Sequence, residues 1–350
     1  MTAYTALALQ VETRAGAGIG AAIDRIAAQV GGSKAWLGPE LRLVVLPEYV
    51  LTGFPVRESP AQWRDRAALD PGGPEYRALG AVAADHDVFL CVNAYERDEH
   101  FPDLFFQATV ILSPAGEAVL RYRRLHSLFS PTPYDVWERY LEIYGIDGVL
   151  PVARTELGNL AAVASEEILM PELARALALR GAEVLCNPTS EASSPALTPK
   201  AVARRARAVE NLAYVVSANS GGLTGIAIPG DSTNGGSEVI DHQGRVLAQA
   251  GPGRRWSPRP SWTSPRCAGP GCGPAWPTCS AGSRPGCGPR STPGTTSNGP
   301  RKACPIGRSS GRGNWRPSPG CTADSGLTRR RCARSCASPA PPAPLPGTPR

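Results

Sequence analysis

Long apolar runs are missing from this sequence, and eight of its ten cysteines lie at irregular spacing after residue 250. No stretch of 18 or more apolar residues occurs, which argues against a membrane-spanning helix. The first ten residues show no basic cluster ahead of an apolar core, so we expect no signal peptide and a cytoplasmic location. The first 250 residues hold two cysteines, Cys91 and Cys186, too few for a disulfide framework. Both stand in apolar stretches and are expected in the core.

Metal and nucleotide motifs are lacking as well. The four histidines are scattered with no metal-ligand spacing: His86, His100, His126 and His242. Gly16, Gly18 and Gly20 precede a helical pattern, but their spacing is not that of a dinucleotide-binding loop, and no phosphate-binding P-loop occurs. We therefore expect neither a metal nor an organic cofactor.

The charge divides the chain into two unlike parts. Residues 251–350 carry 15 arginines and Lys302 against one acidic residue, Asp324, a net charge of +15. Residues 1–250 carry 21 basic and 29 acidic groups, a net charge of −8. The mildly acidic first part argues against nucleic-acid binding by the folded domain.

The last hundred residues lack the apolar content of a domain. They hold 20 prolines and 16 glycines, while Ile306, Leu327 and Leu345 are their only Val, Ile or Leu residues. Such a segment buries too little apolar surface to offset its ordering entropy, so we predict a disordered tail at 253–350 after a domain at 1–252. A basic arm that binds nucleic acid or membranes is a less favoured interpretation. Another hypothesis is a frameshifted reading, because these residue types are the ones that GC-rich codons yield out of frame.

The first 250 residues alternate between strand and helix patterns. Strands are predicted at 4–10, 41–47, 88–94, 105–113, 118–124, 160–164, 184–187, 214–218, 237–240 and 246–250. Helices are predicted from Ile19 past Val30 and at 75–84, 171–180 and 199–211. Continuous apolar strands alternating with helices favour an α/β protein whose sheets are covered by helices, and the two hairpins add antiparallel pairs.

Three segments in order resemble the carbon–nitrogen hydrolase (nitrilase) superfamily. They are residues 46–55 (LPEYVLTGFP), 116–126 (GEAVLRYRRLH) and 164–184 (ASEEILMPELARALALRGAEV). The resemblance extends over about residues 4–250 and implies an α-β-β-α four-layer sandwich, often dimerised through helices. It also implies a Glu-Lys-Cys triad that hydrolyses a small amide or nitrile at a non-peptide C–N bond.

The resemblance assigns roles residue by residue. Glu48 stands where the family has its general base. Arg124 stands where the family has lysine, and Ser165 where it has the cysteine nucleophile. Glu167 matches the acidic residue that follows the cysteine in the family. The family's second glutamate is assigned to Glu138, with Asp135 as the other candidate. Glu167 and Glu138 are therefore predicted to bind substrate. Residues 129–147 and 191–198 are expected to be loops that line the pocket.

The two substitutions leave two functional hypotheses open. A serine hydroxyl attacks only when a base removes its proton, and Arg124 keeps a positive charge but cannot donate a proton. Arg124 is also able to form a bidentate pair with Glu48. The chain is therefore a weak amidase or nitrilase, or an inactive nitrilase-like pseudo-enzyme that binds a small ligand or a protein partner. A conventional serine hydrolase is disfavoured, because no G-x-S-x-G motif surrounds Ser165.

Each candidate also has a purely structural interpretation. Ser165 is suited to cap a helix, and Glu48 to cap one from a turn. Arg124 lies beside Arg121 and Arg123, as in a solvated basic strand end. Three-dimensional proximity of Glu48, Arg124 and Ser165 decides between these interpretations and a shared site.

Overall fold

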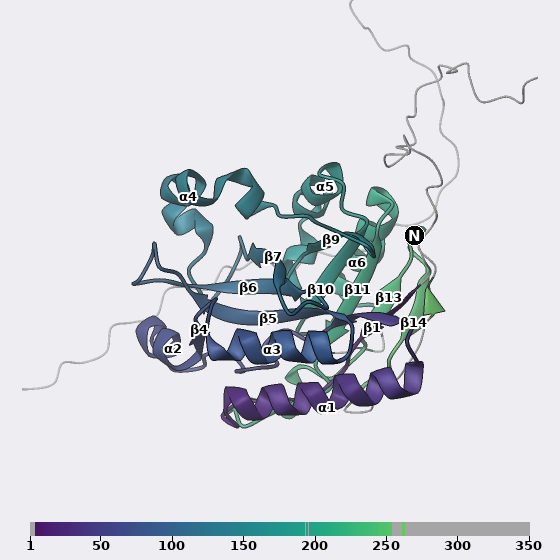
Figure 1. The fold of residues 1–350 in the computed structure, drawn as a ribbon, viewed down its shortest axis with the longest axis horizontal. Helices are drawn as coiled ribbons and strands as arrows, with labels where there is room; N and C mark the ends of the chain where they lie inside the picture. Colours follow the sequence, from purple (N-terminus) through teal and green to yellow (C-terminus); the bar gives the residue numbers. More distant parts are fainter. Residues whose placement is uncertain (1–3, 193, 195, 254–260, 263–350) are drawn as a thin grey trace, which may run out of the picture. The chain divides into compact units, whose positions relative to one another are not determined.

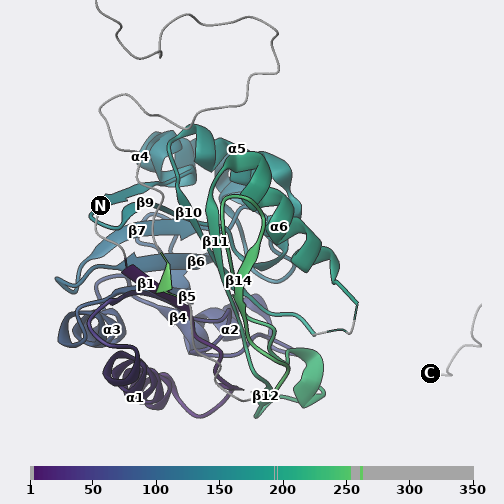
Figure 2. The same ribbon diagram turned by 90° about the vertical axis from the view of Figure 1, so that its right-hand side faces the viewer.

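Two β-sheets face each other between two layers of helices (Figures 1 and 2). The computed structural model describes residues 4–192, 194, 196–253 and 261–262. Its architecture is the α-β-β-α sandwich that the family resemblance implied. From residue 254 on, apart from Ser261–Trp262, the segment predicted to be a disordered tail lies outside the described residues.

The first sheet has the order β15-β1-β3-β5-β6-β7, with β4 paired to β5. Its strands are β1 (Tyr4–Ala8), β3 (Leu41–Val45), β4 (Ala68–Leu69), β5 (Phe89–Arg97), β6 (Phe105–Leu112), β7 (Ala118–Arg123) and β15 (Ser261–Trp262). Helices α1 (Ile19–Leu37) and α3 (Pro74–Asp85) cover its outer face. The helix predicted from Ile19 past Val30 is confirmed, and its residues Ile23, Ile26 and Val30 are buried, while Ile19 is partly buried.

The second sheet has the order β14-β13-β11-β10-β9-β8. Its strands are β8 (Ala153–Thr155), β9 (Gly158–Ala162), β10 (Val184–Thr189), β11 (Tyr214–Asn219), β13 (Glu238–Ile240) and β14 (Val246–Gln249). Helices α5 (Pro171–Leu179) and α6 (Pro199–Asn211) cover its outer face (Figure 2). Cys91 of β5 and Cys186 of β10 are free, fully buried thiols of the central core, as predicted.

Two helices of the structure were not predicted from the sequence. Helix α2 (Pro60–Ala67) has a capping box between Ser59 and Gln62 but buries little beyond Trp63. Helix α4 (Trp137–Val149) follows the 3₁₀ turn η1 (Pro133–Val136) and occupies much of the segment expected to be a loop. The expectation of a loop was wrong for residues 133–147, because Gly145, at φ 61°, kinks the helix and interrupts its apolar period.

The remaining elements are short. They are the paired strands β2 (Thr13–Arg14) and β12 (Leu223–Thr224) and the 3₁₀ turns η2 (Ser165–Leu169) and η3 (Gly230–Ser232). Among the described residues, none of the helices combines the length and the apolar character that a membrane crossing requires.

Candidate active site

The predicted site residues follow the carboxyl ends of strands in both sheets. Strands β3, β5 and β7 run in one direction, and so do β9, β10 and β11. The Glu48 backbone N–H, beyond the end of β3, donates to the carbonyl of Thr189, the last residue of β10, at 3.4 Å. The carboxyl ends of the two sheets therefore meet, in the position where α/β folds place their ligand sites.

Glu48 is held by side chains of the first sheet and is 1% exposed. Its Oε1 accepts hydrogen bonds from Gln107 Nε2 at 2.9 Å and from Arg124 Nη1 at 2.8 Å. Gln107 Nε2 also donates to Asn93 Oδ1 at 3.1 Å. Both side-chain bonds of Glu48 fall on Oε1, so Oε2 takes part in neither. Glu48 is a buried, oriented carboxylate rather than a helix cap.

Arg124 connects Glu48 to the second sheet. Its Nη1 donates to Glu48 Oε1 and to Gln107 Oε1 at 2.9 Å, and its Nη2 donates to Glu166 Oε2. The bidentate pair with Glu48 that the sequence suggested does not form, since the guanidinium divides its nitrogens between two carboxylates. Arg124 is 4% exposed, so it is not a solvated strand end. Burial lowers the pKa of Arg124, but Glu48 and the nearby acidic groups raise it by more, and the group stays charged.

Ser165 is fully buried at the start of η2. Its φ of 47° lies in the left-handed region, which costs a non-glycine residue about 1–3 kcal/mol, and residues strained in this way cluster at functional sites. Ala164, not Ser165, is the N-cap of η2, and the interpretation of Ser165 as a helix cap is wrong. Instead, Ser165 Oγ accepts a hydrogen bond from Lys200 Nζ at 2.9 Å.

Lys200 is a site residue that the sequence prediction missed. It lies in the first turn of α6, is 8% exposed, and also donates to Glu166 Oε1 at 2.7 Å and to the Ser190 carbonyl at 3.0 Å. A signal was present, because residues 1–250 hold two lysines, Lys34 and Lys200, among 21 basic residues. The distance of 35 residues between Lys200 and Ser165 concealed their contact.

Glu166 bridges the two cations of the site. Its Oε2 pairs with Arg124 and its Oε1 with Lys200. Burial raises the pKa of the Glu166 carboxyl, but Lys200 and Arg124 together outweigh burial and bring it to about 2. Glu166 is therefore ionised at neutral pH. One continuous chain of contacts links Glu48, Arg124, Glu166, Lys200 and Ser165.

Glu167 supports the site from behind. It is fully buried; its Oε1 accepts from the backbone N–H groups of Leu125 and His126, at 2.8 and 2.9 Å, and its Oε2 from the Tyr122 hydroxyl at 2.8 Å. These bonds tie η2 to the end of β7, next to Arg124. Burial raises the pKa of Glu167 to about 7, although Arg124 and the three donors lower it.

The raised pKa of Glu167 predicts a pH-dependent contribution to stability. Between the unfolded value of 4.5 and about 7, the folded state binds more protons than the unfolded state, so this group destabilises the fold progressively as pH rises. The wild type is expected to lose about 3 kcal/mol of unfolding free energy through this group between pH 4.5 and pH 8. The uncharged side chain of Glu167→Gln does not lose this amount, so the difference in stability between variant and wild type shifts by about 3 kcal/mol in favour of the variant over the same range. Urea unfolding of both proteins across this range measures it, and parallel stability curves would contradict it.

Glu138 lies apart from these groups. It is exposed in the first turn of α4 and does not line the cavity described next. Asp135, the second candidate, does line that cavity, but its Oδ2 accepts hydrogen bonds from the backbone N–H and hydroxyl of Thr132. Of the two, Asp135 is thus the one near the site, and it caps η1.

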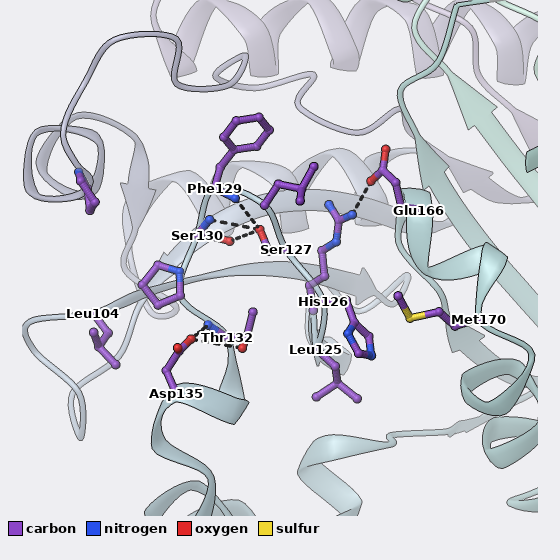
Figure 3. Close-up of a pocket in the computed structure, with 14 residues that line it drawn as sticks. Leu104, Leu125, His126, Ser127, Phe129, Ser130, Thr132, Asp135, Glu166 and Met170 are labelled. Atoms are coloured by element: carbon purple, nitrogen blue, oxygen red, sulfur yellow. Dashed lines mark hydrogen bonds and ion pairs between the residues drawn. The ribbon is translucent and has the colours of Figure 1, made fainter. Parts of the chain in front are cut away.

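A cavity of about 790 Å³ opens over the site (Figure 3). Arg124 and Glu166 line it and form an ion pair with each other, whereas Glu48 and Ser165 do not line it. The loop from His126 to Thr132 supplies much of the remaining wall. Within the part of the chain that the structure describes, no three histidine, cysteine or carboxylate side chains gather as metal ligands.

A two-sheet sandwich with a buried carboxylate, cation and hydroxyl at the strand ends places the chain among nitrilase-fold proteins. The family model for carbon–nitrogen hydrolases matches residues 27–255, so the chain belongs to the carbon–nitrogen hydrolase family.

The relatives that this sequence matches are named as amidases and nitrilases. A formamidase of Pseudomonas syringae pv. syringae is 27% identical over 214 residues, covering 61% of this chain and 57% of the relative. A deaminated glutathione amidase of Yersinia enterocolitica is 26% identical over 225 residues, covering 63% of this chain and 76% of the relative. This chain spans just over half the length of the formamidase.

Solved structures of the superfamily share the fold. Nit3 of Saccharomyces cerevisiae superposes with a TM-score of 0.59 at 21% identity, covering 72% of this chain and 87% of that one. A carbon–nitrogen hydrolase from Helicobacter pylori G27 gives a TM-score of 0.55 at 19% identity, covering 73% and 87%. At these identities the likeness concerns the fold alone.

Proposed function

We propose that this protein hydrolyses a small amide or nitrile with the Ser165 hydroxyl as nucleophile. The observation that supports the proposal is a network of two acidic and two basic side chains connected to one fully buried hydroxyl: Glu48, Arg124, Glu166 and Lys200. Burying a charged side chain is unfavourable in free energy, and clusters of buried titratable side chains are found preferentially at active sites. Membership of a family with amidases and nitrilases supplies the reaction class.

The reaction with an amide follows from the residues present. Glu48 takes the Ser165 proton as Oγ bonds to the carbonyl carbon, and the carbonyl π electrons move to oxygen. The Arg124 charge stabilises that oxyanion without giving up a proton. Collapse breaks the C–N bond, Glu48 returns its proton to the departing nitrogen, and ammonia leaves an ester on Ser165. Water then repeats the sequence with Glu48 as base and releases the acid.

Ammonia release from short amides and nitriles tests this proposal. The wild type is expected to release ammonia slowly. Ser165→Ala is expected to lower the rate at least about 100-fold, because it removes the hydroxyl that is both the nucleophile and the group that the base deprotonates. Ser33→Ala is the matched control, because the Ser33 hydroxyl donates within α1 to Gln29. Equal rates in the wild type and Ser165→Ala would refute the role of Ser165.

One observation favours a second candidate, an inactive protein that binds a small ligand. Glu48 and Ser165 do not line the cavity, and the Arg124–Glu166 ion pair forms part of its wall. In that case calorimetry would detect an amide bound equally by the wild type and Ser165→Ala, while neither protein released ammonia.

A further inference from the structure

We infer that Lys200 is a catalytic residue of this site, the cation whose ammonium acts directly on Ser165 Oγ. The inference deepens the proposed function and rests on Ser165 being the nucleophile. Lys200 Nζ lies 2.9 Å from Ser165 Oγ, whereas the Arg124 guanidinium is occupied by Glu48, Gln107 and Glu166. The two cations thus have different places: Arg124 contacts the base Glu48 and lines the cavity in which the oxyanion forms, whereas Lys200 contacts the attacking Oγ.

The hydrogen bonds of Lys200 define its state. An ammonium has three N–H donors, and Nζ has three acceptors: Ser165 Oγ, Glu166 Oε1 and the Ser190 carbonyl. Nζ therefore acts as a donor in all three contacts. Because Oγ accepts from Nζ, the hydroxyl hydrogen of Ser165 is directed away from Lys200 and left for a base.

This placement stabilises the charge that develops during attack. As the base removes the Ser165 proton, negative charge grows on Oγ before it passes to the substrate oxygen. A positive group already in hydrogen-bond contact with Oγ favours that charge without reorganising, and the water-poor surroundings strengthen the attraction. Lys200 thus compensates in part for the weak acidity of a hydroxyl compared with a thiol.

Helix α6 fixes Lys200 in this position. The Thr198 hydroxyl accepts from the Ala201 N–H at 3.1 Å and donates to Glu191 Oε2 at 3.0 Å, so the first turn is capped and tied down. One turn further on, buried Arg204 donates to Glu238 and to Glu191. Lys200 therefore projects from an anchored helix end, unlike a mobile surface lysine.

Labelling by a fluorophosphonate measures the nucleophilicity of Ser165 without requiring amide turnover. Oγ bonds to phosphorus, the P–F bond breaks, fluoride leaves, and the hydroxyl proton passes to the base. We expect Lys200→Met to slow labelling of Ser165 about 100-fold, the usual effect of removing one preorganised donor. Lys200→Arg keeps the charge and is expected to retain more of the rate, and it serves as the second variant if Lys200→Met does not fold.

Lys34→Met is the matched control. Lys34 Nζ also makes three hydrogen bonds, to the carbonyls of Pro39, Leu41 and Asp87, at the end of α1. It is expected to label at the wild-type rate. Where amide turnover is measurable, Lys200→Met is expected to lower kcat with little change in KM, since Lys200 does not line the cavity.

The outcomes separate this inference from the proposed function. Lys200-dependent labelling of Ser165 without ammonia release would support the inference and refute hydrolysis. Ammonia release with labelling unchanged in folded Lys200→Met would overturn the inference and leave hydrolysis standing. A wild type that is not labelled at Ser165 would also overturn the inference.

Discussion

The double variant Ser165→Cys with Arg124→Lys is expected to hydrolyse short amides about 1,000-fold faster than the wild type, within the range that proton-transfer catalysis supplies. A hydroxyl must lose its proton during attack, whereas a thiol beside cations is already a thiolate at neutral pH. Lys200 Nζ lies in hydrogen-bond contact with the position of the new sulfur. The smaller, flexible ammonium at 124 restores a proton donor that the planar guanidinium lacks.

The single variants show how much of the rate increase each substitution provides. Ser165→Cys is expected to provide most of it and to react rapidly with iodoacetamide at pH 7, because the thiolate is the reactive form. The native thiols of the described domain, Cys91 and Cys186, are fully buried and provide the internal comparison. If the double variant folds but is no faster than the wild type, the carry-over of the family triad to these positions is wrong.

Arg124→Met is expected to lower the free energy of unfolding by about 3–5 kcal/mol, the usual result of removing one partner from a buried ion pair. The substitution leaves Glu48, 1% exposed, without its charged partner, and Glu166 with Lys200 as its remaining cation. Methionine has a similar length, so the loss reflects uncompensated charge more than a cavity. Urea unfolding at neutral pH measures the difference.

Arg139→Met is the matched control for this stability effect. Arg139 pairs with Glu142 at 2.9 Å on the surface of α4, with side chains 64% and 65% exposed. Such pairs contribute about 0–1 kcal/mol, so this variant is expected to stay close to the wild type. Similar losses in the two variants would show that the Arg124 network is not a buried charge cluster.

Apolar periodicity predicted most of the fold. Helix α6 begins and ends where the sequence placed it, because Thr198 and Pro199 are strong start signals, although its buried face mixes alanines with Lys200, Arg204 and Arg207. Helix α4 was missed because Gly145 interrupts it, although Tyr140 packs into the core. Local pattern thus predicts an element when caps and period agree, and fails where a kink removes the period.

Motifs in their order along the chain predicted the candidate site residues, and the catalytic roles of these residues stay predictions. Glu48, Arg124 and Ser165 were placed in this way, and the structure links Glu48 to Arg124 across 76 residues of sequence. Lys200 was not found, because its contact with Ser165 depends on the packing of the first turn of α6 against η2, and no local sequence pattern predicts that packing. Gln107 was missed for the same reason, because its hydrogen bond to Glu48 joins segments 59 residues apart in sequence.

The most direct measurement of the central claim is the location of the acyl group during turnover. The protein is mixed with p-nitrophenyl acetate, quenched in acid within the first turnover, digested and mapped by mass spectrometry. The account predicts an acetyl group on Ser165 that is absent from Ser165→Ala. Burst release of p-nitrophenol with the acetyl group on another residue, or with none on Ser165, would contradict it.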